Sequence, residues 1–193
     1  MVNDNLISRN SLVLKNNPPL ESDLDNLTSR SILIDGRYIC SFCGFHHLKN
    51  ILDMDQAGNY FIVDPFCYFS LHVSLLEDDD AVVVFLPLPR EDVNNLQRTI
   101  FIALQSKDPL KRQQAKDIHN WLLSHEKYIE NYYGTSSFKE WKKVFSLADN
   151  TDFSYIHIIY KNFSIFDKYY DSMELEYTNY PIKKWASLYE INK

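Results

Sequence analysis

The sequence has little of what marks a membrane, secreted or disordered protein. Its 193 residues include only four glycines and seven prolines, which argues against long flexible linkers. No apolar run approaches the roughly 20 residues that cross a bilayer, and the N-terminus lacks the basic and apolar regions of a signal peptide. Three cysteines are an odd number, which fits a disulfide framework poorly. We therefore expect a reduced, cytoplasmic protein with thiols that bind a metal.

A basic surplus is also missing. The chain has 20 lysines and arginines against 26 acidic residues, a net charge of −6. Proteins that bind nucleic acid normally carry positive charge, because neutralising phosphates supplies much of their affinity. The sequence also lacks a glycine-rich phosphate-binding loop and a Gly-x-Ser-x-Gly nucleophile motif. These absences argue against DNA-binding regulators, nucleotide-binding enzymes and serine hydrolases.

What the sequence does contain is a metal-binding half-site. Cys40 and Cys43 are separated by two residues and followed by Gly44, the spacing of a turn that directs two sulfurs at one Zn²⁺. Zinc takes four ligands, and the remaining cysteine, Cys67, lies five residues before His72. We predict a closed, structural Cys3His site. His46 or His47 could replace His72 as the fourth ligand.

The chain is predicted to be an α+β protein, with 45% hydrophobic residues to form its core. Residues 1–36 form an N-terminal segment in which a helix is expected over 23–34. Residues 37–90 form a zinc-binding β region, in which alternation over 71–75 and the apolar run 81–86 predict a hairpin. Residues 91–193 form a helical region, and the whole is expected to be one compact domain.

Several boundaries of the helical region can be predicted from local signals. Apolar residues from Val93 to Leu104 follow a helical spacing. The pair Asp108-Pro109 predicts a helix start, and Gly134 predicts the end of that helix. Ser137-x-x-Glu140 is typical of a capping box, which opens the next helix. The segment 155–166 is ambiguous between helix and strand, and a last helix is expected from Tyr180.

Aromatic residues concentrate in this half, with 18 of the chain's 28 lying between Trp121 and Tyr189. One interpretation is an aromatic core among short helices. The other is a surface groove for a partner peptide, since aromatic residues are enriched where binding energy concentrates. The side chains that we expect to line such a groove are Phe163, Phe166, Tyr169 and Tyr170.

In order along the chain, the sequence resembles the IcmJ (DotN) family of the Dot/Icm, or type IVB, secretion system. The most specific parts are Arg37-Tyr-x-Cys-x-Phe-Cys-Gly-Phe45 and the C-terminal Lys184-Trp-Ala-Ser187. Between them the resemblance covers Leu52-Asp53, Cys67-x4-His72, the strand into Leu86-Pro87, Leu96 to Leu104, and the helix near Gln114. Where that family carries a cysteine as fourth ligand, this chain has His72. Residues 1–36 show no match.

The resemblance implies a zinc protein whose metal region is similar to the HNH-like β-hairpin core of certain endonucleases, without their activity. It implies a cytoplasmic subunit, peripheral to the inner membrane through a secretion complex. In that complex it would be an adaptor that binds the C-terminal tail of a DotL-like coupling ATPase beside an IcmS–IcmW-like chaperone pair. Its role would be to help recruit effector proteins for transport. It would bind no nucleic acid and would not insert into the membrane itself.

The alternative is an HNH-type metal-dependent nuclease. That chemistry needs a general-base histidine beside an acidic residue between the two zinc half-sites. The corresponding segment, Ile51 to Asp55, contains acids but no histidine, and His46 and His47 lie directly after the cysteine turn. The residues therefore favour a protein with no catalytic site.

Overall fold

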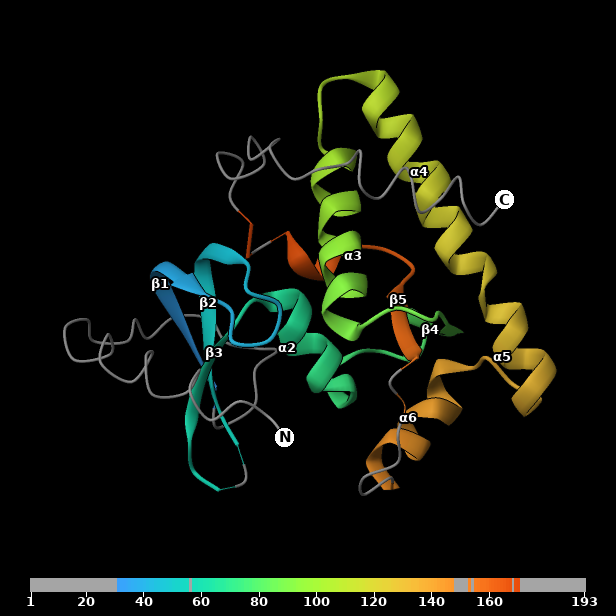
Figure 1. Ribbon diagram of the computed structural model, residues 1–193, viewed down its shortest axis with the longest axis horizontal. Helices are drawn as coiled ribbons and strands as arrows, with labels where there is room; N and C mark the ends of the chain where they lie inside the picture. Colours follow the sequence, from blue (N-terminus) through green and yellow to red (C-terminus); the bar gives the residue numbers. More distant parts are fainter. Residues whose placement is uncertain (1–30, 56, 148–152, 154, 168, 171–193) are drawn as a thin grey trace. The chain divides into compact units, whose positions relative to one another are not determined.

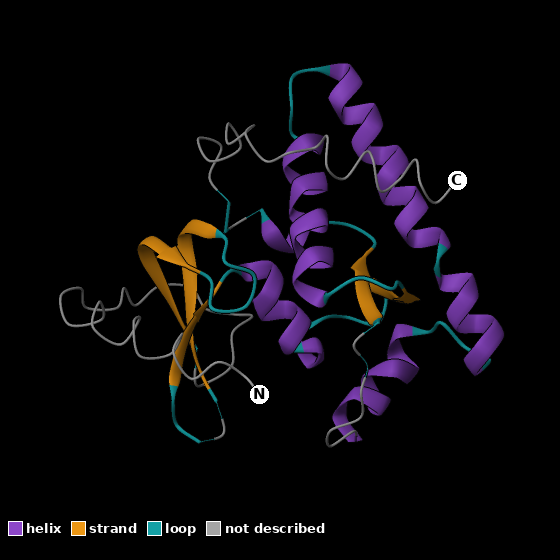
Figure 2. Cartoon of the chain, in the orientation of Figure 1, coloured by secondary structure: helices purple, strands orange, loops and turns teal. Residues whose placement is uncertain are grey.

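The computed structural model describes residues 31–55, 57–147, 153, 155–167 and 169–170 (Figure 1). The chain separates into two compact units, Met1–Leu71 and His72–Lys193. Both helices and antiparallel strands are present, as Figure 2 shows, so the α+β prediction is confirmed. Within the described residues, no helix is both long enough and apolar enough to cross a bilayer.

The first unit contains a three-stranded antiparallel sheet of order β1-β2-β3. Its strands are β1 (Ile32–Ile39), β2 (His46–Met54) and β3 (Tyr60–Val63). Ile32–Ile34 therefore belong to a strand, so the predicted helix over 23–34 is wrong at its end; its earlier residues lie outside the described part. The register of β1 against β2 shifts between Asp35 and Tyr38, directly before the cysteine turn.

A hairpin joins β2 to β3 in the acidic segment between the two half-sites. Asp55 closes the turn, because its Oδ1 accepts from the Asn59 amide at 2.8 Å and its Oδ2 from Asn59 Nδ2 at 3.0 Å. Gly58 lies in the turn with φ of 87°, a conformation that side chains disfavour. These bonds hold the pKa of Asp55 below its usual value. The acidic residue is thus part of a turn.

Helix α2 (Pro65–Leu71) follows β3 and packs against β2. Asp64 caps it, since its Oδ1 accepts from the Phe66 amide at 3.0 Å and its carbonyl accepts from the Tyr68 amide at 2.9 Å. Pro65 at the first helical position suits this start. The strand predicted over 71–75 is therefore wrong: Leu71 ends a helix, and Val73–Leu75 form the 3-10 turn η2.

The second unit is built around a two-stranded antiparallel sheet, β4 (Ala81–Phe85) with β5 (Ile156–Tyr160). The prediction of a buried strand at β4 is confirmed, but its partner comes from the ambiguous segment 155–166 rather than from 71–75. The 3-10 turn η3 (Ser164–Phe166) follows β5. Gln97 extends the sheet's hydrogen bonding: its Nε2 donates to the Ile158 carbonyl at 2.9 Å and its Oε1 accepts from the Tyr160 amide at 2.9 Å.

The helices of this unit largely follow the local signals. They are α3 (Arg90–Leu104), α4 (Pro109–Ser124), α5 (Glu126–Tyr133) and α6 (Phe138–Leu147). Asp108 caps α4 through a 2.9 Å bond from the Leu110 amide, and Gly134 ends α5 with φ of 77°. One predicted helix is therefore two, which meet at His125. The helix expected from Tyr180 lies outside the described residues.

Several aromatic residues of the second unit lie in its core. Phe163, Phe166, Tyr169 and Tyr170 are 8%, 0%, 3% and 6% exposed. Phe101 contacts three of them, with ring centroids 5.2 to 6.3 Å apart. Of the two interpretations of the aromatic-rich half, the structure agrees with the core. A side chain that anchors a partner must be accessible before the partner binds. These four side chains are buried, so they do not line an exposed groove.

Candidate metal centre

The cysteine turn joins β1 to β2 and is fixed by backbone hydrogen bonds. The Cys40 amide donates to the Phe45 carbonyl at 2.9 Å, and the Gly44 amide donates to the Cys40 carbonyl at 3.0 Å. Gly44 has a positive φ of 69°, a conformation that glycine adopts without steric cost. A further bond of 2.8 Å, from the Ser41 amide to the Ile62 carbonyl, fastens the turn to β3. The turn is thereby held beside the end of β3.

Four donor side chains meet at this place. Ligand atoms of Cys40, Cys43, Asp64 and Cys67 all lie within 4.8 Å of one another. Cys40 and Cys43 come from the turn, Asp64 follows β3 directly, and Cys67 lies in the first turn of α2. Cys40, Asp64 and Cys67 are buried, while Cys43 is half-buried. The set has the composition of a site that can hold a metal ion.

Donor chemistry and size fit zinc. Zn–S bonds of about 2.3 Å and Zn–O bonds of about 2.0–2.2 Å place the corners of a tetrahedron roughly 3.5–3.8 Å apart. The Sγ of Cys43 already donates to Asp64 Oδ2 at 3.1 Å. Only a small rearrangement would therefore direct all four donors at one ion. A divalent cation here would also compensate the charge of a carboxylate that is removed from water.

Hydrogen bonds among the three sulfurs shift the pKa values of Cys40 and Cys67 in opposite directions. Side-chain hydrogen bonds with Cys43 and Cys67 lower the pKa of Cys40 to about 4. The pKa of Cys67 is raised, first because it donates to Cys40 and further because it is buried. One sulfur of the cluster is thus stabilised as a thiolate, which is the form that binds metal.

The fourth donor is the main difference from the sequence prediction. Cys40, Cys43 and Cys67 come together, but the residue that joins them is Asp64. His72 is the first residue of the second unit and precedes η2; with Asp64, the cluster needs no histidine to complete a tetrahedron. His46 begins β2 with an exposed side chain, and it is not among the four. Ligation by His72 stays a prediction.

Two signals in the sequence could have found Asp64. The spacing Asp64-x2-Cys67 repeats the spacing Cys40-x2-Cys43, with a carboxylate in the place of one thiol. The pair Asp64-Pro65 is also the same helix-start signal as Asp108-Pro109, and it would have replaced the strand prediction with a helix. In a helix, a residue five positions after Cys67 points about 140° away from it.

The acids of the segment between the half-sites serve the fold. Asp53 is 1% exposed, and its Oδ1 accepts from Ser31 Oγ at 2.7 Å. That serine in turn accepts from Tyr68 Oη at 3.1 Å. Asp55 is engaged in the β2–β3 turn, as described above.

Comparison with known proteins adds no identity. No protein-family profile matches the chain, and no curated protein is significantly similar to it.

Proposed function

We propose that this protein is a non-enzymatic adaptor subunit of a type IVB secretion coupling complex, stabilised by one structural Zn²⁺. Its partner would be the C-terminal tail of a DotL-like coupling ATPase, beside an IcmS–IcmW-like chaperone pair. The observation that supports this proposal is the closed donor set: three thiols and a carboxylate are enough for a tetrahedral ion and leave no position for substrate or water. An HNH-like arrangement of the first unit is part of the same proposal.

The role of the metal would be to hold the first unit together. It would join the β1–β2 turn to the start of α2, two segments that the chain separates by the whole β2–β3 hairpin. Metal binding in such sites contributes folding free energy directly. Elemental analysis of the reduced protein should give one zinc per chain. A protein that is folded without metal would contradict this role.

The four aromatic residues predicted to bind the tail are buried. Exposed aromatic residues are therefore better candidates for the tail-binding surface. In the described part of the region from 153 onward, Tyr155 is 49% exposed. Its ring packs against that of Phe85, which is 43% exposed, with the ring centroids 6.2 Å apart. Such a pair offers an apolar anchor without the cost of exposing the core. A tail that orders on binding should bury more than about 1,500 Å² in total.

A pull-down with the ATPase tail, followed by calorimetry, tests the adaptor role. Tyr155→Ala should weaken binding by about 1–3 kcal/mol without unfolding the protein. Tyr132→Ala is the matched control, because Tyr132 is also exposed, at 83%, but lies on α5. If the tail does not bind at all, the adaptor assignment fails; if both variants bind like the parent, only the choice of surface fails.

A nuclease assay tests the alternative. With Mg²⁺, Mn²⁺ or Ni²⁺ the protein should leave plasmid and single-stranded DNA intact. Binding to DNA should be weak at physiological salt, because a net charge of −6 repels phosphate. Metal-dependent cleavage that His46→Ala abolishes would reverse the conclusion and make the protein an enzyme.

A further inference from the structure

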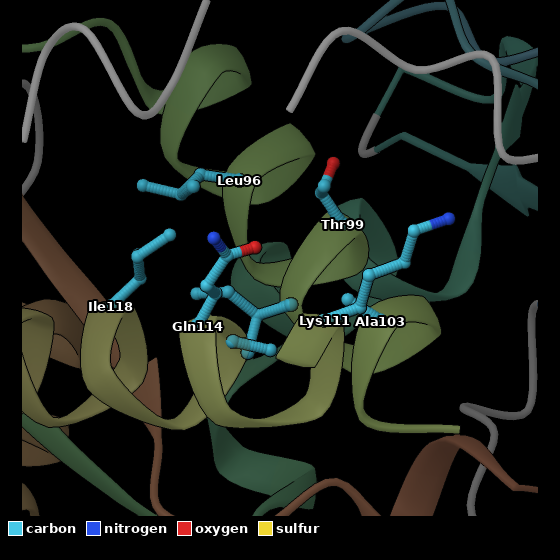
Figure 3. A pocket seen from close by; sticks show the side chains of 8 residues that line it. Leu96, Thr99, Ala103, Lys111, Gln114 and Ile118 are labelled. Atoms are coloured by element: carbon cyan, nitrogen blue, oxygen red, sulfur yellow. The ribbon is translucent and has the colours of Figure 1, made fainter. Parts of the chain in front are cut away.

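The hollow between α3 and α4 in the second unit is too small for a ligand (Figure 3). It has room for about one water molecule, and its lining residues are the faces through which the two helices pack against each other. Leu96, Ile100 and Ala115 line it and are only 1–3% exposed. Reactive side chains meet instead in the cysteine cluster of the first unit.

Two thiols of this cluster lie within one turn of backbone. The Gly44 amide donates to the Cys40 carbonyl at 3.0 Å, so a single hydrogen bond closes the turn that contains Cys40 and Cys43. Cα atoms three positions apart in such a turn are less than about 7 Å apart, a distance that a disulfide can span. The two Sγ atoms lie within 4.8 Å of each other, and both cysteines are free thiols. A disulfide between them therefore requires movement within the turn only.

Cys43 is the thiol that an oxidant in water reaches first. It is half-buried, whereas Cys40 and Cys67 are each only 1% exposed. The neighbours of Cys43 in the turn, Phe42 and Gly44, are exposed, so the tip of the turn faces the solvent. The susceptibility of a cysteine to peroxide depends on its exposure as well as on its thiolate character. Oxidation should therefore begin at Cys43.

We propose that the cysteine turn is a redox site, at which a peroxide converts Cys40 and Cys43 into a disulfide. In the first step the Cys43 sulfur attacks hydrogen peroxide, the O–O bond breaks, and Cys43 becomes a sulfenic acid while one water leaves. In the second step the Cys40 sulfur attacks the Cys43 sulfur, the S–O bond breaks, and a second water leaves with the Cys40 proton. Two thiols thereby lose two electrons, and one hydrogen peroxide is reduced to two waters. Where a metal holds the two sulfurs as thiolates, the two protons come from the solvent.

Release of the metal would follow, and this consequence rests on the proposed function, whereas the disulfide itself does not. A thiolate is the form of cysteine that binds metal, and a disulfide has none. Only Cys67 and Asp64 would remain of the four donors that a structural zinc ion needs. The β1–β2 turn would then lose its metal link to α2 until a reductant restored the thiols. The stability of the first unit would thus depend on its redox state.

Peptide mapping of the full-length protein tests the disulfide. After treatment with excess hydrogen peroxide, the remaining thiols are blocked with iodoacetamide and the chain is cleaved with trypsin. Because trypsin cleaves after lysine and arginine, Cys40 and Cys43 share the peptide 38–49, while Cys67 falls in the peptide 50–90. The first peptide should be unalkylated and lighter by two hydrogens, and the second should be alkylated once. Dithiothreitol before the blocking step should restore alkylation of all three cysteines.

Three results of this mapping overturn the proposal. They are alkylation of all three cysteines after peroxide, a disulfide that joins the two peptides through Cys67, and a sulfinic acid at Cys43 without a disulfide. A chromogenic chelator measures zinc in parallel, and one zinc should be released for each disulfide formed. Zinc that stays bound after the disulfide has formed overturns the metal release. A reduced protein without zinc contradicts the proposed function, but its peptide map still decides whether the disulfide forms.

A matched pair of variants tests the role of Cys43. Cys67→Ser and Cys43→Ser each remove one thiol and one candidate metal ligand. Cys67→Ser should still form the disulfide in peroxide, whereas Cys43→Ser, whose two remaining thiols are buried, should lose its thiols more slowly by about tenfold or more. Equal rates in the two variants overturn the assignment of Cys43. If neither variant folds, the peptide map of the unchanged chain decides.

Discussion

The two units of this chain are stabilised in different ways. The first places polar groups in its interior: three cysteines and Asp64 in one cluster, and Asp53 hydrogen-bonded to Ser31. The second buries an aromatic core in which Tyr160, Phe166 and Phe101 pack ring against ring. In the first unit a metal ion bound by the cluster would satisfy these buried groups, whereas the second depends on apolar area removed from water.

The comparison shows how one chain can stabilise units of unequal size. A small unit buries a smaller fraction of its surface than a large one, so a metal cross-link is a common supplement. In the first unit this cross-link would join the β1–β2 turn to α2. The second unit has more chain from which to build a core.

The largest expected effect is the loss of the metal. Cys40→Ser removes one of the four candidate metal ligands, whose sulfur is hydrogen-bonded to the other two cysteines. The first unit should lose up to about 10 kcal/mol of metal-derived stability, while β4 and β5 keep their protection. Amide hydrogen exchange on the full chain, with zinc content measured in parallel, separates the two units. Loss of protection in both would mean that the units fold as one.

A substitution in the aromatic core should weaken the second unit and leave the first unit unchanged. Phe166 is 0% exposed, and its ring lies 4.8 Å from that of Tyr160. Phe166→Ala should cost about 3–5 kcal/mol in the second unit because it leaves a cavity. Zinc content should not change. Urea unfolding measures the cost, and the exposed Tyr155→Ala is the control, with an expected loss below about 1 kcal/mol. A lowered zinc content in Phe166→Ala would contradict the independence of the two units.

Acid should weaken the second unit through His157. This residue is 3% exposed; its Nε2 lies 3.1 Å from the Leu86 carbonyl, while its Nδ1 is buried and has no hydrogen-bond partner among the described residues. Burial lowers its pKa to about 4, below the 6.5 of a free histidine. As the pH falls from 6.5, the unfolded state takes up the proton first, so stability present above pH 6.5 is lost down to pH 4.

Between pH 7 and pH 5 this effect amounts to about 2 kcal/mol. Burial lowers the pKa of His119 as well, which adds to the loss in the same direction. Exchange of the β4 and β5 amides at both pH values gives the measurement. His157→Gln keeps a donor for the Leu86 carbonyl and removes the titration, so the pH dependence should become smaller. An unchanged dependence in that variant would exclude His157 as its source.

The smallest effects are expected at Asp64, which serves both the metal and α2. Asp64→Cys keeps four metal donors but removes the helix cap, which should cost about 1 kcal/mol in the protection of α2. Asp64→Asn keeps an oxygen for the Phe66 amide but loses the anionic ligand, so zinc affinity should fall by at least about tenfold. Competition with a chelator compares the two. Equal zinc affinity in the parent and in Asp64→Asn would exclude Asp64 as a ligand.

The accuracy of the sequence predictions follows the distance over which each signal acts. Asp108-Pro109 and Gly134 mark helix ends in both the prediction and the structure, because each acts on its own neighbours in the chain. The strand prediction over 71–75 is wrong, because alternation over so few residues also occurs in short helices and turns. The pair Asp64-Pro65 is an equally local start signal, and it marks the beginning of α2.

The sequence by itself determined the cysteine turn, since two thiols at this spacing with Gly44 behind them allow few other local structures. It also determined the burial of β4 and the helical character of the region from 90 to 147. Only the tertiary structure decided that Asp64 completes the cluster, that β5 is the partner of β4, and that Phe166 lies in the core. These outcomes depend on which distant segments meet, and that depends on how the whole unit buries its apolar surface, which no short stretch of sequence encodes.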